Sequence, residues 1–431
     1  MENERPVMEL DKKADDLLKD PKVLSRFVEE IGKRIAGERD TLAAILLHLF
    51  GVLVKNASMK THLIVNSESS AGKSYICNQI RKIFPEDYIE YRTKITPEVL
   101  TYWHNAKYEP DWNWDGKVLY LEDVRDDVLN SPTFKVMASE GSIATVVIKQ
   151  RAIDIKIQGS PIIVLTSADS TPNAEIINRF SIINLDETPM QTKNVVKKQI
   201  EIAINGGHED YEPYFTEAIR KLVRCNVKLP VWLDKLVESF PEDIMRVRRD
   251  IGRFIDLVRA SAVLHQNQRE FDIVSKTVWA TEDDYTLARE ISTKISDAGG
   301  SYGLTHRLQK CYKSCIEYFM ETEEYFSVKE IHKYNPIVSE RAWYTILDGL
   351  TQRGLLKVDL RKPPEGSSST RTTTTFYPAS SIKLSLPKVK ELIGNEVNED
   401  NEVNEANEYN EVSNNDNNIK VSKKKGKNRF V

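Results

Sequence analysis

One segment restricts the possible folds of this chain more than any other: LIVNSESSAGKSYI, residues 63–76. Thr61–Asn66 is apolar enough to predict a short buried strand, and Lys73–Phe84 predicts an amphipathic helix. A strand, a loop of small residues and a helix that begins with Gly-Lys-Ser form the pattern of a phosphate-binding loop. The first glycine of that pattern is replaced by Ser67. The segment predicts an α/β fold that holds a nucleotide.

Each residue of this loop has a predicted role in holding ATP and Mg²⁺. Small side chains let backbone N–H groups wrap a phosphate, and the N-terminus of the following helix favours the same anion. Lys73 is expected to reach the β- and γ-phosphates, and the hydroxyl of Ser74 to ligate Mg²⁺. The expected nucleotide-binding residues are Ser69, Ser70, Ala71, Gly72, Lys73 and Ser74.

A second motif, VLYLEDV at residues 118–124, is an apolar strand that ends in two acids. Carboxylates at this position suit a hard cation and an attacking water. Glu122 is expected to hold the metal, directly or through water, and Asp123 to polarise the water. The usual order of these acids is Asp then Glu, which this chain reverses. The alternative reading is a strand end that is merely exposed.

Two further strand ends carry candidate catalytic groups. Ser160–Thr166 predicts a buried strand that ends in Thr166 and Ser167, small polar residues able to contact the γ-phosphate or the water. Arg179 precedes the strand Phe180–Leu185. In a ring, Arg179 could reach the ATP of the neighbouring subunit. A surface ion pair with a nearby acid is the equally weighted alternative.

The rest of the chain predicts two more regions. Residues 191–300 predict helices without a strand. Residues 305–380 predict three helices, with Ser327 and Ser339 as N-caps, and then two strands around a basic loop. This is the outline of a winged helix-turn-helix, whose exposed recognition residues would be Arg341 and Tyr344. Such a module contacts DNA or docks a protein, and the sequence leaves both open.

Composition sets the class of protein. A length of 431 residues predicts two or three domains. The net charge is −4, but residues 395–419 carry eight acidic residues and no Lys or Arg. The rest of the chain is therefore mildly basic, which is compatible with a DNA-binding surface. The polar N-terminus and the short apolar runs predict a cytoplasmic protein with no membrane partner. The four cysteines have no zinc-site spacing.

The order of these motifs resembles a known family. DPKVLSRFVEEIGKRIAGERDTLAAILLHLFGVLVK followed by the phosphate loop resembles the AAA+ core of the minichromosome maintenance (MCM) helicases, and the MCM-like replication helicases of mobile elements. The resemblance covers about residues 20–265, and the winged helix extends it to about 380. It implies an AAA+ P-loop NTPase core with a helical lid domain and a C-terminal winged helix.

The resemblance also implies residue roles. Arg179, in Asn-Arg-Phe, matches the arginine that acts on a neighbouring subunit. Arg249 matches the second sensor on the lid helix, with Arg246 and Arg248 as alternatives. The hairpin turn with Lys149 and Arg151 falls where the family grips DNA in its central channel. The expected divisions are an extension (1–20), ATPase core (21–190), helical lid (191–300), winged helix domain (301–383) and disordered tail (384–431).

These observations favour an ATP-dependent DNA helicase, translocase or replication initiator. It would assemble as a ring-shaped homo-oligomer, a hexamer, and meet replication partner proteins. One alternative is a loader or remodeller of proteins that does not unwind DNA. The other is a winged-helix DNA-binding regulator that uses ATP only as a switch.

Overall fold

The structure is a computed structural model. It describes residues 4–67, 72–103, 112–122, 124, 126–138, 142–148, 151–167, 179–207, 210–239, 247–297, 306–352, 355–361, 372–379 and 386–393. The chain divides into two units, which are described separately: residues 1–230 with 240–385, and residues 231–239 with 386–431. Of the helices within the described part, none is both long and apolar enough to cross a membrane.

The first unit is built on a parallel sheet of five strands in the order β2-β3-β6-β1-β7. The strands are β1 (Leu63–Asn66), β2 (Ile89–Arg92), β3 (Val118–Leu121), β6 (Ile162–Ser167) and β7 (Ser181–Asn184). All four residues of β1 and of β3 are buried, as expected of strands that are covered on both faces. This sheet confirms the α/β fold that the phosphate-loop pattern predicts.

Helices cover both faces of the sheet, because alternate side chains of each strand point to opposite faces. On one face α3 (Arg39–Phe50) and α4 (Lys73–Ile83) pack on Val118 and Tyr120 of β3. On the other face α5 (Pro97–Tyr102) and α7 (Pro132–Met137) join a core with Leu119, Leu121, Ile163 and Leu165. Within the described residues before β7, the other helices are α1 (Glu4–Leu18), α2 (Val23–Gly32) and α6 (Asp126–Leu129). Short 3₁₀ helices are η1 (Gly51–Leu53) and η2 (Glu86–Tyr88).

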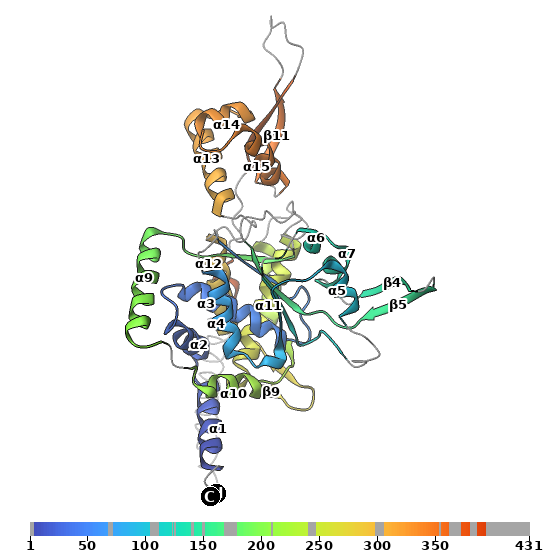
Figure 1. The fold of residues 1–431 in the computed structure, drawn as a ribbon, viewed down its shortest axis with the longest axis vertical. Helices are drawn as coiled ribbons and strands as arrows, with labels where there is room; N and C mark the ends of the chain where they lie inside the picture. The colour runs from blue at the N-terminus through green and yellow to red at the C-terminus, as the bar shows by residue number, and fades with distance from the viewer. Residues whose placement is uncertain are drawn as a thin grey trace, which may run out of the picture. The chain divides into compact units, whose positions relative to one another are not determined.

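A separate hairpin lies between β3 and β6 in the sequence. Its strands, β4 (Ser142–Ile148) and β5 (Arg151–Ile157), pair antiparallel along their whole length, with Ile148 opposite Arg151 (Figure 1). Neither strand is part of the five-stranded sheet. The expected hairpin is therefore present, and Lys149 and Gln150, which separate its two strands in the sequence, lie outside the described residues.

The region after β7 corrects the expectation of helices alone. It contains α9 (Pro189–Ile204), α10 (Pro213–Lys221), α11 (Val247–Leu264), α12 (Glu282–Asp297) and η4 (Gln266–Gln268). It also contains a three-stranded sheet of β8 (Asn226–Lys228), β10 (Thr277–Trp279) and β9 (Phe271–Asp272), in that order. Strands of two or three residues are too short to show the alternating pattern by which a sequence reveals a strand.

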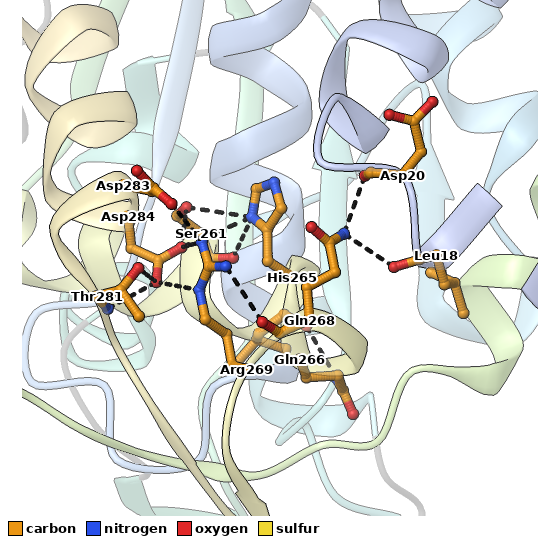
Figure 2. A network of polar contacts seen from close by, with 11 residues as sticks. Leu18, Asp20, Ser261, His265, Gln266, Gln268, Arg269, Thr281, Asp283 and Asp284 are labelled. Carbon is orange, nitrogen blue, oxygen red and sulfur yellow. Dashed lines mark hydrogen bonds and ion pairs between the residues drawn. The ribbon is translucent and has the colours of Figure 1, made fainter. Parts of the chain in front are cut away.

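A buried polar network joins α11 to α12 (Figure 2). The carboxylate of Asp284 is fully buried and accepts hydrogen bonds from the Ser261 hydroxyl at 2.7 Å and Arg269 Nε at 2.9 Å. Gln268 donates to the carbonyl oxygens of Leu18 and Asp20, both at 2.9 Å. Since a buried carboxylate is stable only with such partners, the network fixes α11 and α12 together.

Residues 306–379 form three helices and an antiparallel strand pair. The elements are α13 (His306–Thr322), α14 (Val328–Tyr334), α15 (Glu340–Gln352), β11 (Leu356–Arg361) and β12 (Thr373–Pro378). Ser327 caps α14 in a capping box with Glu330, and the Ser339 hydroxyl accepts from the backbone N–H of Ala342. Both predicted N-caps are therefore confirmed. Around Trp343, Phe326 and Leu347 the helices and strands share one apolar core.

The second unit contains two short elements within its described part, η3 (Val231–Ser239) and α16 (Val389–Ile393). Lys235 Nζ donates to the carbonyl oxygen of Ile393 at 3.5 Å, and Leu236, Leu386 and Leu392 are buried. Five residues of the expected disordered tail thus form a helix.

Candidate nucleotide site

Three strands bring the predicted site residues to one edge of the sheet. The strand β6 lies between β1 and β3, with Thr166 opposite Val65 and Leu165 opposite Leu121. The carboxyl ends of parallel strands meet at one edge, so Thr166 and Glu122 lie beside the end of the phosphate loop's own strand. Successive side chains of a strand point to opposite faces of the sheet, and by this alternation Thr166 and Glu122 both lie on the face that α4 covers.

The described end of the phosphate loop has the geometry that a close approach to a ligand requires. Gly72 has φ +91°, a left-handed conformation that side chains other than glycine rarely adopt, and its Cα faces open space. Its carbonyl oxygen accepts from Ile76 at 2.9 Å, which starts α4 at Lys73. Ser69, Ser70 and Ala71 lie outside the described residues.

Lys73 spans the loop. Its side chain is 6% exposed, and its Nζ donates to the carbonyl oxygen of Ser67 at 2.8 Å. The ammonium group is thus held near both ends of the loop, where the phosphates are expected. Ser74 follows on the first turn of α4, and Asn78 lies one turn further on the same helix face.

The carboxylate of Glu122 is surrounded by hydrogen-bond donors from three elements. Tyr91 Oη of β2 donates to Oε2 at 2.5 Å, Tyr120 Oη of β3 donates to Oε1 at 3.1 Å, and Asn78 Nδ2 of α4 donates to Oε1 at 3.3 Å. Sequence analysis singled out none of the three, although strand alternation puts Tyr120, two residues before Glu122, on the same face. Asp123 lies outside the described residues.

The residues at this edge fit Mg²⁺ by the chemistry of their donor atoms. A carboxylate and a hydroxyl, from Glu122 and Ser74, are the oxygen ligands that this ion takes together with phosphate oxygens and water. A compact cluster of three or more His, Cys, Asp or Glu is absent from the described part of the chain.

A cavity of about 700 Å³ opens beside Gly72. Its walls are the loop Arg34–Glu38, the first turn of α4 and one side of α9. The apolar lining residues are Ile35, Ala36, Ile76, Val195, Val196 and Ile202. A volume of this size with a mostly apolar lining suits a small organic ligand.

The cavity wall is fixed by contacts between the loop and α9. Gln191 Nε2 donates to the carbonyl oxygen of Ala36 at 2.7 Å, and Gly37, at φ +65°, leaves too little room for a Cβ beside the Gln191 amide. Glu38 accepts from the backbone N–H of Asp186 at 2.8 Å and from the Thr41 hydroxyl at 2.5 Å. Burial raises the pKa of the Glu38 carboxyl.

The predicted arginines lie in different surroundings. Arg179 is half-buried, and its Nη1 donates to the carbonyl oxygen of Lys135 at 2.7 Å within the same chain. Arg249 is exposed on α11. One turn further, Arg253 is buried and donates to the carbonyl oxygen of Phe180 at 2.6 Å. Arg253, which the sequence analysis did not single out, is therefore the α11 arginine tied to the strand that follows Arg179.

The predicted DNA-binding residues that the structure describes are all exposed. Arg151 is exposed at the start of β5, and Lys149 lies outside the described residues. Arg341 and Tyr344 are exposed one turn apart on α15, and Tyr344 is 58% exposed.

The parallel sheet, the Gly-Lys-Ser turn and the acidic strand end together define a P-loop nucleotide-binding domain, the core of an NTPase. The comparison with protein families agrees. The profile of the MTBMA_p00010 P-loop domain family matches residues 8–227, which is more than half of the chain. The chain belongs to this family. No curated protein matches it.

Proposed function

We propose that this protein is an ATP-dependent motor that acts on DNA, as a helicase, translocase or replication initiator, and that it works as a hexameric ring. The single observation that carries the proposal is the strand order β2-β3-β6-β1-β7. It sets Lys73, Thr166 and Glu122 along one edge of a sheet, which is the arrangement that hydrolysis of a bound triphosphate needs.

The chain's own residues supply the parts of the reaction. Lys73 would neutralise the β- and γ-phosphates, and Ser74 and Glu122 would hold Mg²⁺. When bound, the ion supplies charge stabilisation for the phosphate oxygens. Asp123 would accept a proton from the attacking water, with Thr166 and Ser167 beside it. The cavity between the Arg34–Glu38 loop and α9 would hold the adenosine.

Two basic features support a DNA partner. The β4–β5 hairpin is separate from the central sheet and carries Arg151 at the start of β5, two residues after Lys149 in the sequence. Residues 306–379 have the helix and strand order of a winged helix, with Arg341 and Tyr344 exposed on the third helix. Cationic side chains of this kind bind phosphates of the DNA backbone.

A strand-separation assay tests the proposal. The purified full chain is mixed with a forked DNA duplex labelled with a fluorophore and a quencher, with ATP and Mg²⁺. We expect strand separation that requires ATP and is lost in Lys73→Ala. Nucleotide hydrolysis without strand separation, with a rate that DNA does not change, would contradict the motor and favour a loader or remodeller of proteins.

A further inference from the structure

The carboxylate of Glu122 has more hydrogen-bond donors than an exposed strand end needs. Oε1 accepts from Tyr120 Oη at 3.1 Å and from Asn78 Nδ2 at 3.3 Å, while Oε2 accepts from Tyr91 Oη at 2.5 Å. A carboxylate offers about four lone-pair positions. Three of them are used by these donors, so one position on Oε2 is left to face a further ligand.

The donors are themselves oriented by neighbouring groups. Arg81 Nε donates to Asn78 Oδ1 at 3.3 Å, which turns the NH₂ group of that amide toward Glu122. The guanidinium carbon of Arg81 also lies 4.4 Å from the centre of the Tyr91 ring. The rings of Tyr91 and Tyr120 are 5.0 Å apart. One cation and one ring contact thus hold two of the donors in place.

Tyr91 and Tyr120 both meet Glu122 with phenol hydroxyl groups, which are neutral hydrogen-bond donors. A neutral phenol donates a hydrogen bond to a carboxylate without adding charge, so it orients Glu122 and leaves its negative charge available to a cation.

We propose that Tyr91, Tyr120 and Asn78 are positioning residues that fix the Glu122 carboxylate so that a single lone pair of Oε2 meets Mg²⁺, directly or through one water. This inference rests on the proposed function, because it needs a nucleotide–Mg²⁺ complex at this edge of the sheet. Groups that orient a metal ligand without touching the metal typically change metal affinity by about 10- to 100-fold.

Tyr91→Phe is the sharpest variant, because it removes only the hydroxyl group. Tyr88→Phe is the matched control: the same substitution three residues earlier, at a tyrosine that is not a donor to Glu122. The readout is binding of a fluorescent ATP analogue to the full chain, in EDTA and over a titration of free Mg²⁺. Asn78→Ala provides a second test, and thermal unfolding without nucleotide checks that each variant is folded.

We expect all variants to bind the analogue equally in EDTA. Tyr91→Phe should then need about tenfold more free Mg²⁺ for half of the Mg²⁺-dependent gain in affinity, and Asn78→Ala should shift in the same direction. Tyr88→Phe should match the wild type.

Other results would overturn the inference in distinguishable ways. If Glu122→Gln loses the Mg²⁺-dependent gain but Tyr91→Phe and Asn78→Ala titrate like the wild type, the positioning role is wrong and the proposed function stands. If the wild type itself shows no nucleotide binding, or no response to Mg²⁺, the proposed function fails and this inference fails with it.

Discussion

Lys73 Nζ donates a hydrogen bond to the carbonyl oxygen of Ser67, 2.8 Å away, and so links the two ends of the phosphate loop. The bond forms although the first residue of the loop is serine. Ser67 itself is 3% exposed and follows directly on β1. Because the acceptor is a backbone carbonyl group, which serine and glycine share, the presence of Ser67 in place of glycine does not remove this hydrogen bond.

Lys73→Ala should abolish nucleotide hydrolysis and weaken nucleotide binding by more than about tenfold, because no other cation takes its place in the loop. The measurement is steady-state hydrolysis together with equilibrium binding of a fluorescent nucleotide. Lys82→Ala, an exposed lysine of the same helix, is the control and should behave as the wild type. Normal hydrolysis by Lys73→Ala would remove the phosphate-loop assignment.

Val195→Trp should raise the Kd for the nucleotide by about tenfold or more, because the larger side chain fills part of the cavity beside Gly72. Ile200→Trp is the matched control on the same helix, since Ile200 is exposed and does not line the cavity. Inorganic triphosphate should compete for the loop equally well in both variants. Equal nucleotide affinity in the two variants would place the base elsewhere.

The sequence predicted the strands that carry the site but not the whole sheet. Lys117–Leu121 and Ser160–Thr166 are apolar runs, and β3 and β6 lie within a residue or two of them. The edge strand β2 was missed because its four residues, Ile89–Arg92, contain only two apolar positions, which is too short an alternation to stand out in the sequence. Because β2 was not predicted, Tyr91 could not be placed beside Glu122 from the sequence.

The surroundings of individual site residues depend on contacts between segments that are far apart in the sequence. Arg249 and Arg253 are four residues apart on one helix and share a face, so periodicity cannot separate them. Only the packing of α11 beside Phe180 shows that Arg253 is buried and Arg249 is exposed. Of the donors to Glu122, Tyr91 and Asn78 lie 31 and 44 residues away from it in the sequence, and no local pattern links them to it.

Arg179→Ala should leave nucleotide binding nearly unchanged and abolish hydrolysis only in assembled rings, if Arg179 acts on a neighbouring subunit. Mixing this variant with Asp123→Asn should restore hydrolysis at some subunit junctions, measured over a range of mixing ratios. Because Arg179 Nη1 also bonds the carbonyl oxygen of Lys135, thermal unfolding of the variant must be measured alongside. A failure to restore activity at every ratio would argue against a role in trans.

Arg151→Glu should reduce the stimulation of hydrolysis by DNA by at least several-fold and leave the basal rate unchanged. Arg151 is exposed at the hairpin and away from the nucleotide site, so the charge reversal acts on phosphate contacts alone. Lys12→Glu, an exposed lysine on α1, controls for the change in net charge. Equal loss in both variants would mean that the hairpin has no special part in DNA binding.

Stability should fall as the pH drops below about 6.5, because two histidines are buried in neutral form. Burial lowers the pKa of His62 to about 3 and that of His48 to about 4. Between those values and 6.5 the unfolded chain binds more protons than the folded chain, so protonation favours unfolding. Each histidine should contribute a slope of up to about 1.4 kcal/mol per pH unit.

Urea unfolding at pH 7, 6 and 5 measures this slope, and His48→Gln should reduce it. Neutral His62 accepts from the Ile163 N–H at 3.0 Å, and its Nε2 donates to the Ala138 carbonyl oxygen at 2.7 Å, so both ring nitrogens are satisfied without a charge. A free energy of unfolding that stays constant from pH 7 to 5 would contradict the assignment.

The most direct test of the central claim is the rate of ATP hydrolysis by the purified full chain, with and without single-stranded DNA, with Lys73→Ala as the blank. A DNA-acting motor predicts Mg²⁺-dependent hydrolysis that DNA stimulates several-fold. Hydrolysis that is the same with and without DNA, or nucleotide binding with no hydrolysis at all, would contradict it.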